Sequence, residues 1–393
     1  MRHGRRSQDS PFLKFTTAEF HRRGTKLRRD LSNKTLVHQL LEGKTLGGAE
    51  LGLPAQHAVL NSTDQITSEL LGERAALKFA HGWSAKGVML LERVAQNRYF
   101  DHMALREWTL EGIRQEQQKI TDKFPRKKSA WIVEDFLRGA QPGGVPYDYK
   151  FYMFQGQIGV IAQIDRNSSP VRAAMLDGAM KPLVPGRDYY ADANDIQPAA
   201  PLVPRSAVML SRWAIELSKM TDAPFARIDL YDTEDGPYFG EFTFSTGAEI
   251  KGRVIYSHRM LAHLDELFAD AQKELRGEPV EARQSWSRLL QSAEPERLAE
   301  HPMVDLELYK RYSYYLHNQG SLGGHRLARA EEALSDHGGY SDIAHHLRDA
   351  HRAAARHVDH RLDNRPSELR RVATKVYRKV AGFAPDSFPF PTR

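Results

Sequence analysis

Short apolar runs separated by glycine-containing turns fill the middle of the chain, from residue 75 to residue 249. Two pairs of these runs flank tight turns. FYMFQGQIGVIAQI has Gln155-Gly156 at its centre, and DLYDTEDGPYFGEF has Asp235-Gly236. Strand-like runs on either side of such turns predict two antiparallel hairpins.

Helical periodicity, with apolar residues every three or four positions, occurs in residues 30–43, in residues 206–220 and from residue 257 onward. Asp30 or Ser32 is the expected N-cap of the first helix, and Gly43 its end. The expected buried faces are Leu36, Val37, Leu40 and Leu41 in the first helix; Val208, Met209, Trp213, Leu217 and Met220 in the second; and Met260, Leu261, Leu264, Leu267 and Phe268, followed by Ile343, Leu347 and Ala350, in the last region. Pro366 and Gly382 are expected to bracket the last helix. The pattern predicts an α+β region followed by helices.

The chain of 393 residues is longer than one ordinary domain, so we expect several parts. These are a loosely held basic N-terminal arm at 1–29, a helical region at 30–74, an α+β domain at 75–255 and a helical C-terminal region at 256–393. No apolar run reaches the roughly 18–20 residues of a membrane span, and the basic start lacks the apolar segment of a signal peptide. We therefore expect a cytoplasmic protein.

The amino-acid composition limits which catalytic and metal-binding groups the chain can use. The chain has no Cys, which excludes thiolate metal sites and cysteine nucleophiles, so catalysis must use oxygen and nitrogen groups. The formal charge of +6 is compatible with a polyanionic partner but does not identify one. Nine of the 17 His lie in residues 301–360, yet no HExxH pair accompanies them, so a solvated helical surface is favoured over a zinc cluster.

A first candidate site is the loop from Lys78 to Gly87, KFAHGWSAKG, between two apolar strands. Gly82 and Gly87 flank Ser84 and Lys86, and such a loop can fold over phosphates and offer backbone amides. It lacks the Lys and Ser/Thr of a Walker loop, and an ordinary hairpin turn remains the alternative.

A second candidate is the strand WIVEDFL, which carries Glu134 and Asp135 and is followed by Asp148 and Lys150. Because side chains two residues apart share a strand face, Lys150 and Asp148 should point the same way. A solvated strand edge is the simpler explanation of the carboxylate pair.

The third candidate joins Arg227 and Asp229 on one strand to Glu241 and Thr243 on the strand that should pair with it. Because side chains alternate between the two faces of a strand, Arg227 and Asp229 share one face of their strand, and Glu241 and Thr243 share one face of theirs. Converging carboxylates repel unless a cation joins them, and Mg²⁺ held by carboxylates and nucleotide phosphates meets that need. A salt bridge of Arg227 with either carboxylate is the alternative.

In order, LKFAHGWSAKGVML, IVEDFL, DYKFYMFQGQ and ARIDLYDTEDGPYFGEFTFSTG resemble the ATP-grasp superfamily, and within it the TupA-like family named for teichuronopeptide synthesis. The resemblance covers about residues 30–255. It implies an ATP-grasp fold, in which two α+β lobes grip ATP, here with a helical C-terminal extension.

The resemblance also implies roles for individual residues. Lys78 would grip the phosphates under the loop of Gly82, Ser84, Lys86 and Gly87; Glu134, Asp135, Phe136 and Leu137 would form the adenine-contacting hinge; and Asp148 would bind the ribose. Lys150 would reach the phosphate or substrate, and Arg227 would stabilise the transferring phosphoryl group. Asp229, Glu241 and Thr243 would hold one or two Mg²⁺ ions. Many ATP-grasp ligases have Asn where this chain has Thr243, as in the TupA-like form, and a Thr hydroxyl is a weaker ligand.

As a function, the resemblance implies an ATP-dependent carboxylate–amine ligase that forms an amide or peptide bond through an acyl phosphate. The acid would be a small molecule, a glycan or a peptide. A phosphotransferase acting on a hydroxyl and a non-enzymatic polyanion binder are the alternatives, and no nucleic-acid partner is expected because no recognition motif is present. The C-terminal helices would shape the acceptor side, form a homo-oligomer interface or stabilise the domain.

Overall fold

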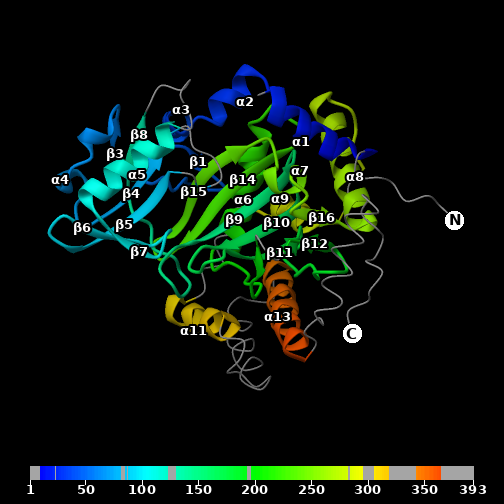
Figure 1. Ribbon diagram of the computed structural model, residues 1–393. Coiled ribbons are helices and arrows are strands. Elements are labelled where there is room, and N and C mark those ends of the chain that lie inside the picture. The colour runs from blue at the N-terminus through cyan, green and yellow to red at the C-terminus, as the bar shows by residue number, and fades with distance from the viewer. Residues whose placement is uncertain are drawn as a thin grey trace.

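Two six-stranded sheets lie next to each other and form the frame of the molecule (Figure 1). The computed structural model describes residues 9–22, 24–80, 85, 87–122, 130–192, 196–281, 284–294, 305–317 and 342–363. Pro366 and Gly382, the expected brackets of a last helix, lie outside these residues.

The first sheet has the order β3-β8-β4-β5-β6-β7, and every neighbouring pair in it is antiparallel. Its strands are β3 (Gln56–Leu60), β4 (Arg74–Phe79), β5 (Val88–Ala95), β6 (Arg98–Asp101), β7 (Arg106–Thr109) and β8 (Trp131–Glu134). Leu77 and Val133 point to one face, where they pack with Ile113 and Ile120 of helix α5 (Leu110–Asp122). The alternation of side chains leaves the opposite face to Ala76, Lys78 and Glu134.

The second sheet has the order β13-β11-β10-β9-β14-β15. Its strands are β9 (Tyr147–Phe154), β10 (Gln157–Asp165), β11 (Arg172–Asp177), β13 (Gln197–Pro198), β14 (Ala226–Thr233) and β15 (Gly236–Thr243). Both predicted hairpins are confirmed. Gln155 and Gly156 form the first turn with φ of 45° and 87°, as a two-residue hairpin turn requires. The second turn is Glu234-Asp235, because Gly236 already pairs with Thr233.

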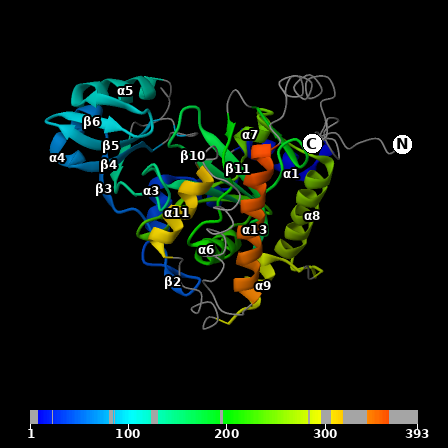
Figure 2. The same cartoon turned by 90° about the horizontal axis from the view of Figure 1, so that it is seen from below.

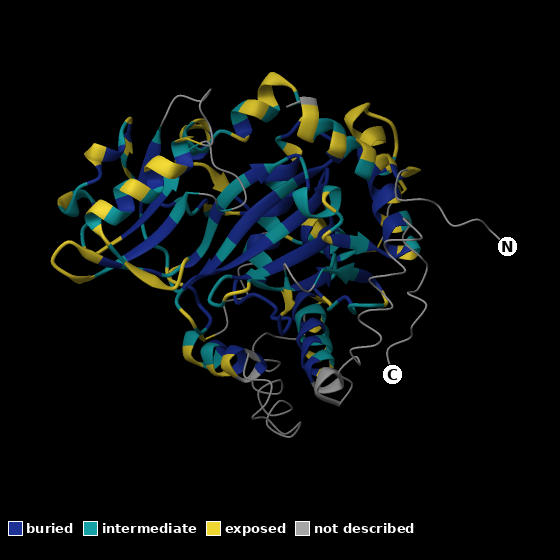
Figure 3. Cartoon of the chain, in the orientation of Figure 1, coloured by how far each residue is buried: buried dark blue, intermediate teal, exposed yellow. Residues whose placement is uncertain are grey.

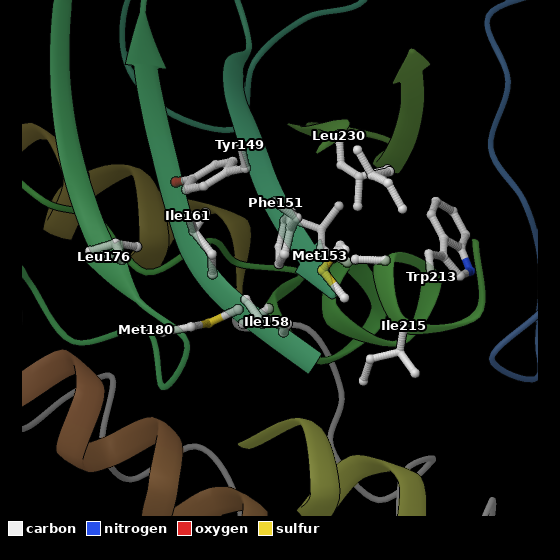
Figure 4. Packing of buried hydrophobic residues seen from close by; sticks show 14 of the residues in the cluster. Tyr149, Phe151, Met153, Ile158, Ile161, Leu176, Met180, Trp213, Ile215 and Leu230 are labelled. Atoms are coloured by element: carbon white, nitrogen blue, oxygen red, sulfur yellow. The ribbon is translucent and has the colours of Figure 1, made fainter. Parts of the chain in front are cut away.

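The principal core lies between the second sheet and helix α6 (Ala207–Lys219) (Figure 4). Phe151 and Met153 of β9 point into it, and the buried Trp213 of α6 donates its indole N–H to the carbonyl of Leu46 over 2.9 Å. The helix predicted at 206–220 is confirmed. Of its expected buried face, Trp213 and Leu217 are buried. Val208, Met209 and Met220 are only half-buried, whereas Leu210 and Ala214, which were not expected, are fully covered. Figure 3 shows the strands of this sheet as largely buried.

Helices α1 (Pro11–Arg22) and α8 (His258–Leu275) cover the opposite face of the second sheet at one end. The apolar stripe predicted for α8 is confirmed, since all five of its residues are buried. The expectation of a loosely held N-terminal arm is wrong for residues 9–22: Phe12 is fully buried, and its ring lies 4.9 Å from that of Phe225. Ser10 donates to the carboxylate of Asp265 in α8 over 2.6 Å, which anchors the helix.

This packing predicts a large difference between two phenylalanines of α1. Phe12→Ala should lower the free energy of unfolding by about 3–5 kcal/mol, because it leaves a cavity among buried rings. Phe20→Ala on the same helix should change it by less than about 1 kcal/mol, because Phe20 is 47% exposed. Urea unfolding measures both values. Equal, small losses would mean that Phe12 does not pack against Phe154 and Phe225.

The cap of the helix expected from Asp30 is also corrected. Asp30 lies in α2 (Lys26–Leu31), and α3 (Lys34–Leu41) begins after Asn33, whose side chain accepts from the amide of Thr35 at 3.1 Å. Val37 and Leu41 are buried, whereas Leu36 and Leu40 are exposed. The short elements are β1 (Thr45–Leu46), β2 (Ala49–Glu50), the 3₁₀ helix η2 (Thr63–Gln65), α4 (Ser68–Leu71), β12 (Tyr189–Ala191), α7 (Gly247–Ile250) and β16 (Val254–Tyr256).

Three C-terminal helices, α9 (Trp286–Ser292), α11 (Leu306–His317) and α13 (Asp342–Asp363), lie on the α6 side of the second sheet (Figure 2). Two histidines of α13 are packed inside the protein and do not belong to a solvated surface. His346 stacks on Trp286 with ring centroids 4.3 Å apart, and burial lowers the pKa of His351 to about 4. None of the described helices combines the length and apolar character needed to cross a membrane.

Candidate functional site

The faces of the two sheets that point away from α5 and α6 enclose a cleft of about 1120 Å³. Strand alternation determines its walls: Ala76 and Lys78 reach it from the first sheet, and Lys150 and Asp229 from the second. The same alternation sends Leu77 and Phe151 into the two cores behind these walls. The cleft therefore brings together polar residues from segments far apart in the sequence.

Arg227, Asp229 and Lys150 form the centre of the second wall. Arg227 Nε and Nη2 donate to the two carboxylate oxygens of Asp229 at 2.7 and 2.8 Å, in a bidentate pair. The Lys150 ammonium pairs with Asp229 as well and lies 2.6 Å from Asp148 Oδ2. The salt bridge considered as the alternative for Arg227 is thus present in the structure.

The charges of this cluster fix its protonation. Burial acts to raise the pKa of Asp229, but Arg227 and Lys150 outweigh it and lower that pKa to about 2. Burial disfavours the charge of Arg227, yet Asp229 more than compensates and raises its pKa. Burial raises the pKa of Asp148, with Lys150 opposing it. Asp229 is therefore an anion and Arg227 a cation throughout the physiological range.

Glu241 and Thr243 lie on β15 directly opposite Asp229 and Arg227, as predicted. The Thr243 hydroxyl accepts from Arg227 Nη2 at 3.0 Å, and Glu241 Oε1 lies 3.5 Å from the same nitrogen. Glu241 Oε2 is also 3.3 Å from the ammonium of Lys34, at the start of α3. The N-terminal helices thus reach the candidate metal ligand.

Asp148 has one carboxylate oxygen without a hydrogen-bond partner among the described atoms. Its side chain is 6% exposed and Oδ2 is held by Lys150, with Arg166 at 3.8 Å, while Oδ1 is buried and has no hydrogen-bond partner among the described atoms. An unpaired buried acceptor costs free energy, so a hydroxyl donor brought by a ligand would be favourable here.

The first wall contributes Lys78, whose ammonium pairs with Glu134 across neighbouring strands β4 and β8. Residues 135–146 then link the first sheet to β9 of the second. Asp135 lines the cleft, but its carboxylate is bound by the amide of Ala55 at 3.0 Å and by His57 at 2.8 Å. Leu137 lines the cleft too.

Two expected residues do not line the cleft. Phe136 packs against the buried cluster of Ala76, Leu90 and Val145 and faces a second, smaller cavity. Gly87 closes the β4–β5 hairpin with φ of 73°, and a Cβ there would lie 2.7 Å from that of Phe79, so the close approach requires glycine. Gly82, Ser84 and Lys86 lie outside the described residues.

Three further residues, which the sequence pattern did not predict, line the cleft: Lys34, Arg166 and Tyr231. Arg166 follows the predicted strand of the first hairpin directly, and Tyr231 continues the alternation of Arg227 and Asp229. The pattern could have indicated both. Lys34 meets a partner 207 positions away, for which the sequence carries no local signal.

The sequence model of the TupA-like ATPgrasp family matches residues 22–255, more than half of the chain. The chain belongs to the TupA-like ATP-grasp family. By this membership it is an ATP-grasp protein; the structure shows its two α+β lobes and the helices that follow the matched residues.

A search of curated proteins finds no significant match. Solved structures similar to this TupA-like chain include the ATP-grasp ligase PsnB complexed with a minimal precursor (11% identity, TM-score 0.30, 56% of each chain covered). Another is D-alanine–D-alanine ligase from Bacillus anthracis complexed with ATP (13% identity, TM-score 0.35, 70% of this chain and 78% of that chain). The chain spans 53–59% of the length of the PsnB structures.

The residues of the TupA-like cleft suit ATP and Mg²⁺. Asp229, Glu241 and Thr243 offer the hard oxygen atoms that Mg²⁺ prefers, beside a cluster of cations that suits phosphates. Among the described residues, no three His, Asp or Glu side chains by themselves form a metal site, so phosphate oxygens would have to complete the coordination. The unpaired Asp148 Oδ1 suits a ribose hydroxyl.

Proposed function

We propose that this protein is an ATP-dependent carboxylate–amine ligase whose acid substrate is anionic. The charge of the cleft carries the proposal: nine Lys and Arg side chains line it, against six Asp and Glu. Positive charge in a cleft with low-dielectric walls attracts anions. The excess suits two anionic partners in the same space, a nucleotide phosphate chain and a carboxylate.

In the first step, a carboxylate oxygen of the acid attacks the γ-phosphorus of ATP. The bond from that phosphorus to the β-phosphate oxygen breaks, and ADP leaves with the electron pair. Lys78, Lys150 and Arg227 stabilise the negative charge spread over the transferring oxygens. Mg²⁺, when held by Asp229, Glu241 and Thr243, supplies further neutralisation of phosphate charge.

In the second step, an amine attacks the carbonyl carbon of the acyl phosphate. The carbon–oxygen bond to phosphate breaks, inorganic phosphate leaves, and the amine nitrogen loses its proton. The chain needs no nucleophile of its own for this route. Its share is to hold the reactants together and to keep water away from the acyl phosphate.

Hydroxylamine trapping tests the proposal directly. The full chain is incubated with ATP, Mg²⁺ and a library of acids. One set of reactions contains hydroxylamine, and a second set contains a library of amines instead. We expect an acyl hydroxamate, and ADP and inorganic phosphate in equal amounts. ADP formed without phosphate release, with a phosphorylated product in the mass spectrum, would instead indicate transfer to a hydroxyl.

Lys34 provides a prediction about the cations that line the cleft. Lys34→Ala should lower kcat/KM for ATP turnover by about tenfold, equivalent to about 1.4 kcal/mol, because it removes one of the cations that line the cleft and attract its anionic substrates. Lys34→Arg should retain most activity. Lys26→Ala serves as the control, because Lys26 is 84% exposed, does not line the cleft, and among the described residues pairs with Asp30 of its own helix. Equal activity of the Lys34 and Lys26 variants would contradict the role.

A further inference from the structure

A second cavity, of about 600 Å³, lies on the other side of Phe136 from the cleft. We call it the linker cavity, because most of its lining comes from residues 136–144 of the segment that joins the two sheets. Helix α11 supplies Lys310, Arg311 and Tyr314 to its wall. This helix lies beyond the residues matched by the family model, so the cavity is built in part by the C-terminal extension.

The linker cavity is separate from the cleft. Along β5, Val88 and Leu90 line the cleft, whereas Glu92, the next residue on the same strand face, lines the linker cavity. The cluster of Leu90, Val145 and Phe136 borders both spaces. A volume of about 600 Å³ lies in the usual range of small-molecule sites.

The acidic residues of the linker cavity already have close partners. Glu92 lies 2.6 Å from Arg74 and 3.0 Å from His102, and Glu234 lies 2.6 Å from Lys310. Arg138 comes no closer than 4.0 Å to Glu92. Within the described part of the chain, Arg311 has no carboxylate within salt-bridge distance. Two guanidinium groups in the lining are therefore available to an anion.

Gln141 adds a requirement for a donor. This residue lines the cavity and is only 2% exposed; its Nε2 donates to the carbonyl of Val145 at 2.8 Å. Its Oε1 is buried and has no hydrogen-bond partner among the described atoms. Because an unpaired buried carbonyl is costly, a ligand N–H or O–H at this position would be favourable. The rings of Phe136 and Tyr314, which also line the cavity, suit a flat apolar body.

We propose that the linker cavity is a second binding site, which takes a small carboxylate with a flat apolar body and an N–H or O–H donor. Arg311 and Arg138 bind the carboxylate, because a guanidinium fork matches its two oxygens. The donor meets Gln141 Oε1. The cavity is thus a ligand site distinct from the one that holds the reacting groups.

Indole-3-acetate is the probe, because it combines a carboxylate, a flat ring and one N–H donor, and indole-3-acetamide is its uncharged counterpart. We expect calorimetry on the full chain to show one saturable site for the acid, and binding of the amide at least tenfold weaker. One probe molecule should still bind when ADP and Mg²⁺ saturate the cleft. Equal affinity for acid and amide, loss of the probe on nucleotide addition, or no binding at millimolar concentration would overturn the proposal.

Variants of the full chain locate the probe. Arg311→Ala should weaken indole-3-acetate binding at least tenfold, and Arg311→Lys should weaken it less, since Lys keeps the charge but loses the fork. Arg356→Ala, an exposed arginine on α13 that lines neither space, is the matched control and should change binding less than twofold. Unchanged unfolding midpoints show that all three variants are folded. An Arg311→Ala protein that binds the acid as tightly as the unaltered chain would contradict the assignment.

Discussion

Replacing Glu241 by Gln should lower ATP turnover by about 100-fold or more, equivalent to about 2.7 kcal/mol of transition-state stabilisation. The substitution keeps the shape of the side chain but removes the charge that would hold Mg²⁺ beside the phosphates. Steady-state ADP release at saturating ATP and Mg²⁺ measures the loss. Turnover within about threefold of the unaltered chain would refute the metal role.

Glu241 is a better test residue than Asp229. Glu241 is 35% exposed, and its contacts with Arg227 and Lys34 are at 3.3 Å or more, so its loss should cost at most about 1 kcal/mol of stability. Asp229→Asn would instead leave the charges of Arg227 and Lys150 buried beside a neutral amide, at a cost of roughly 3–5 kcal/mol. A low activity of that variant could therefore reflect unfolding.

The matched control is Asp235→Asn, which neutralises a carboxylate in the exposed turn of the same hairpin. It should retain turnover within about twofold, because Asp235 does not line the cleft.

The pH range of the assay also matters. The pKa of Asp229 is lowered in the folded chain, so its ionisation contributes stability above its unfolded pKa of about 3.9, and this contribution is lost as the pH falls toward 2. Assays above about pH 6 leave it fully ionised.

The sequence predicted the second wall of the cleft well because its information is local. Period-two alternation and two short turns determine that Arg227 and Asp229 share a face, and the hairpin places Glu241 and Thr243 opposite them. No contact with a distant segment is needed to reach this result. The family resemblance, and not the pattern, then gave these residues their expected roles.

What the sequence could not provide depends on docking between distant segments. The basic composition of residues 1–29 suggested an arm, but the single apolar run PFLKF was enough to anchor α1 beside α8. Lys34 approaches Glu241, and α11 closes the linker cavity, only because helices pack against strands far along the chain. Neither contact leaves a periodic signal at either end.

The C-terminal helices lead to the second large effect. A chain ending at Glu278 should fail to fold cooperatively, and should lose nucleotide binding for that reason. Trp286 of α9 is 1% exposed in the principal core, and its indole N–H donates to Ser211 of α6 at 2.9 Å. Ser287 accepts from the backbone amide of Ile158 in β10 at 3.0 Å. Removing these groups, together with the buried Tyr312 of α11, uncovers the back of the sheet that carries Lys150 and Asp229.

Point variants measure this contribution without deleting the segment. Trp286→Ala should destabilise the full chain by about 3–5 kcal/mol, a large part of the roughly 5–15 kcal/mol that stabilises a typical domain. Trp286→Phe should cost less, because it keeps most of the packing and loses mainly one hydrogen bond. Denaturant unfolding, monitored by circular dichroism, measures the loss of stability in each of the two variants. If the chain ending at Glu278 unfolded cooperatively at the same midpoint as the full chain, the helices would be dispensable for folding, and a role at the acceptor side or in an oligomer would become the better explanation of why they are present.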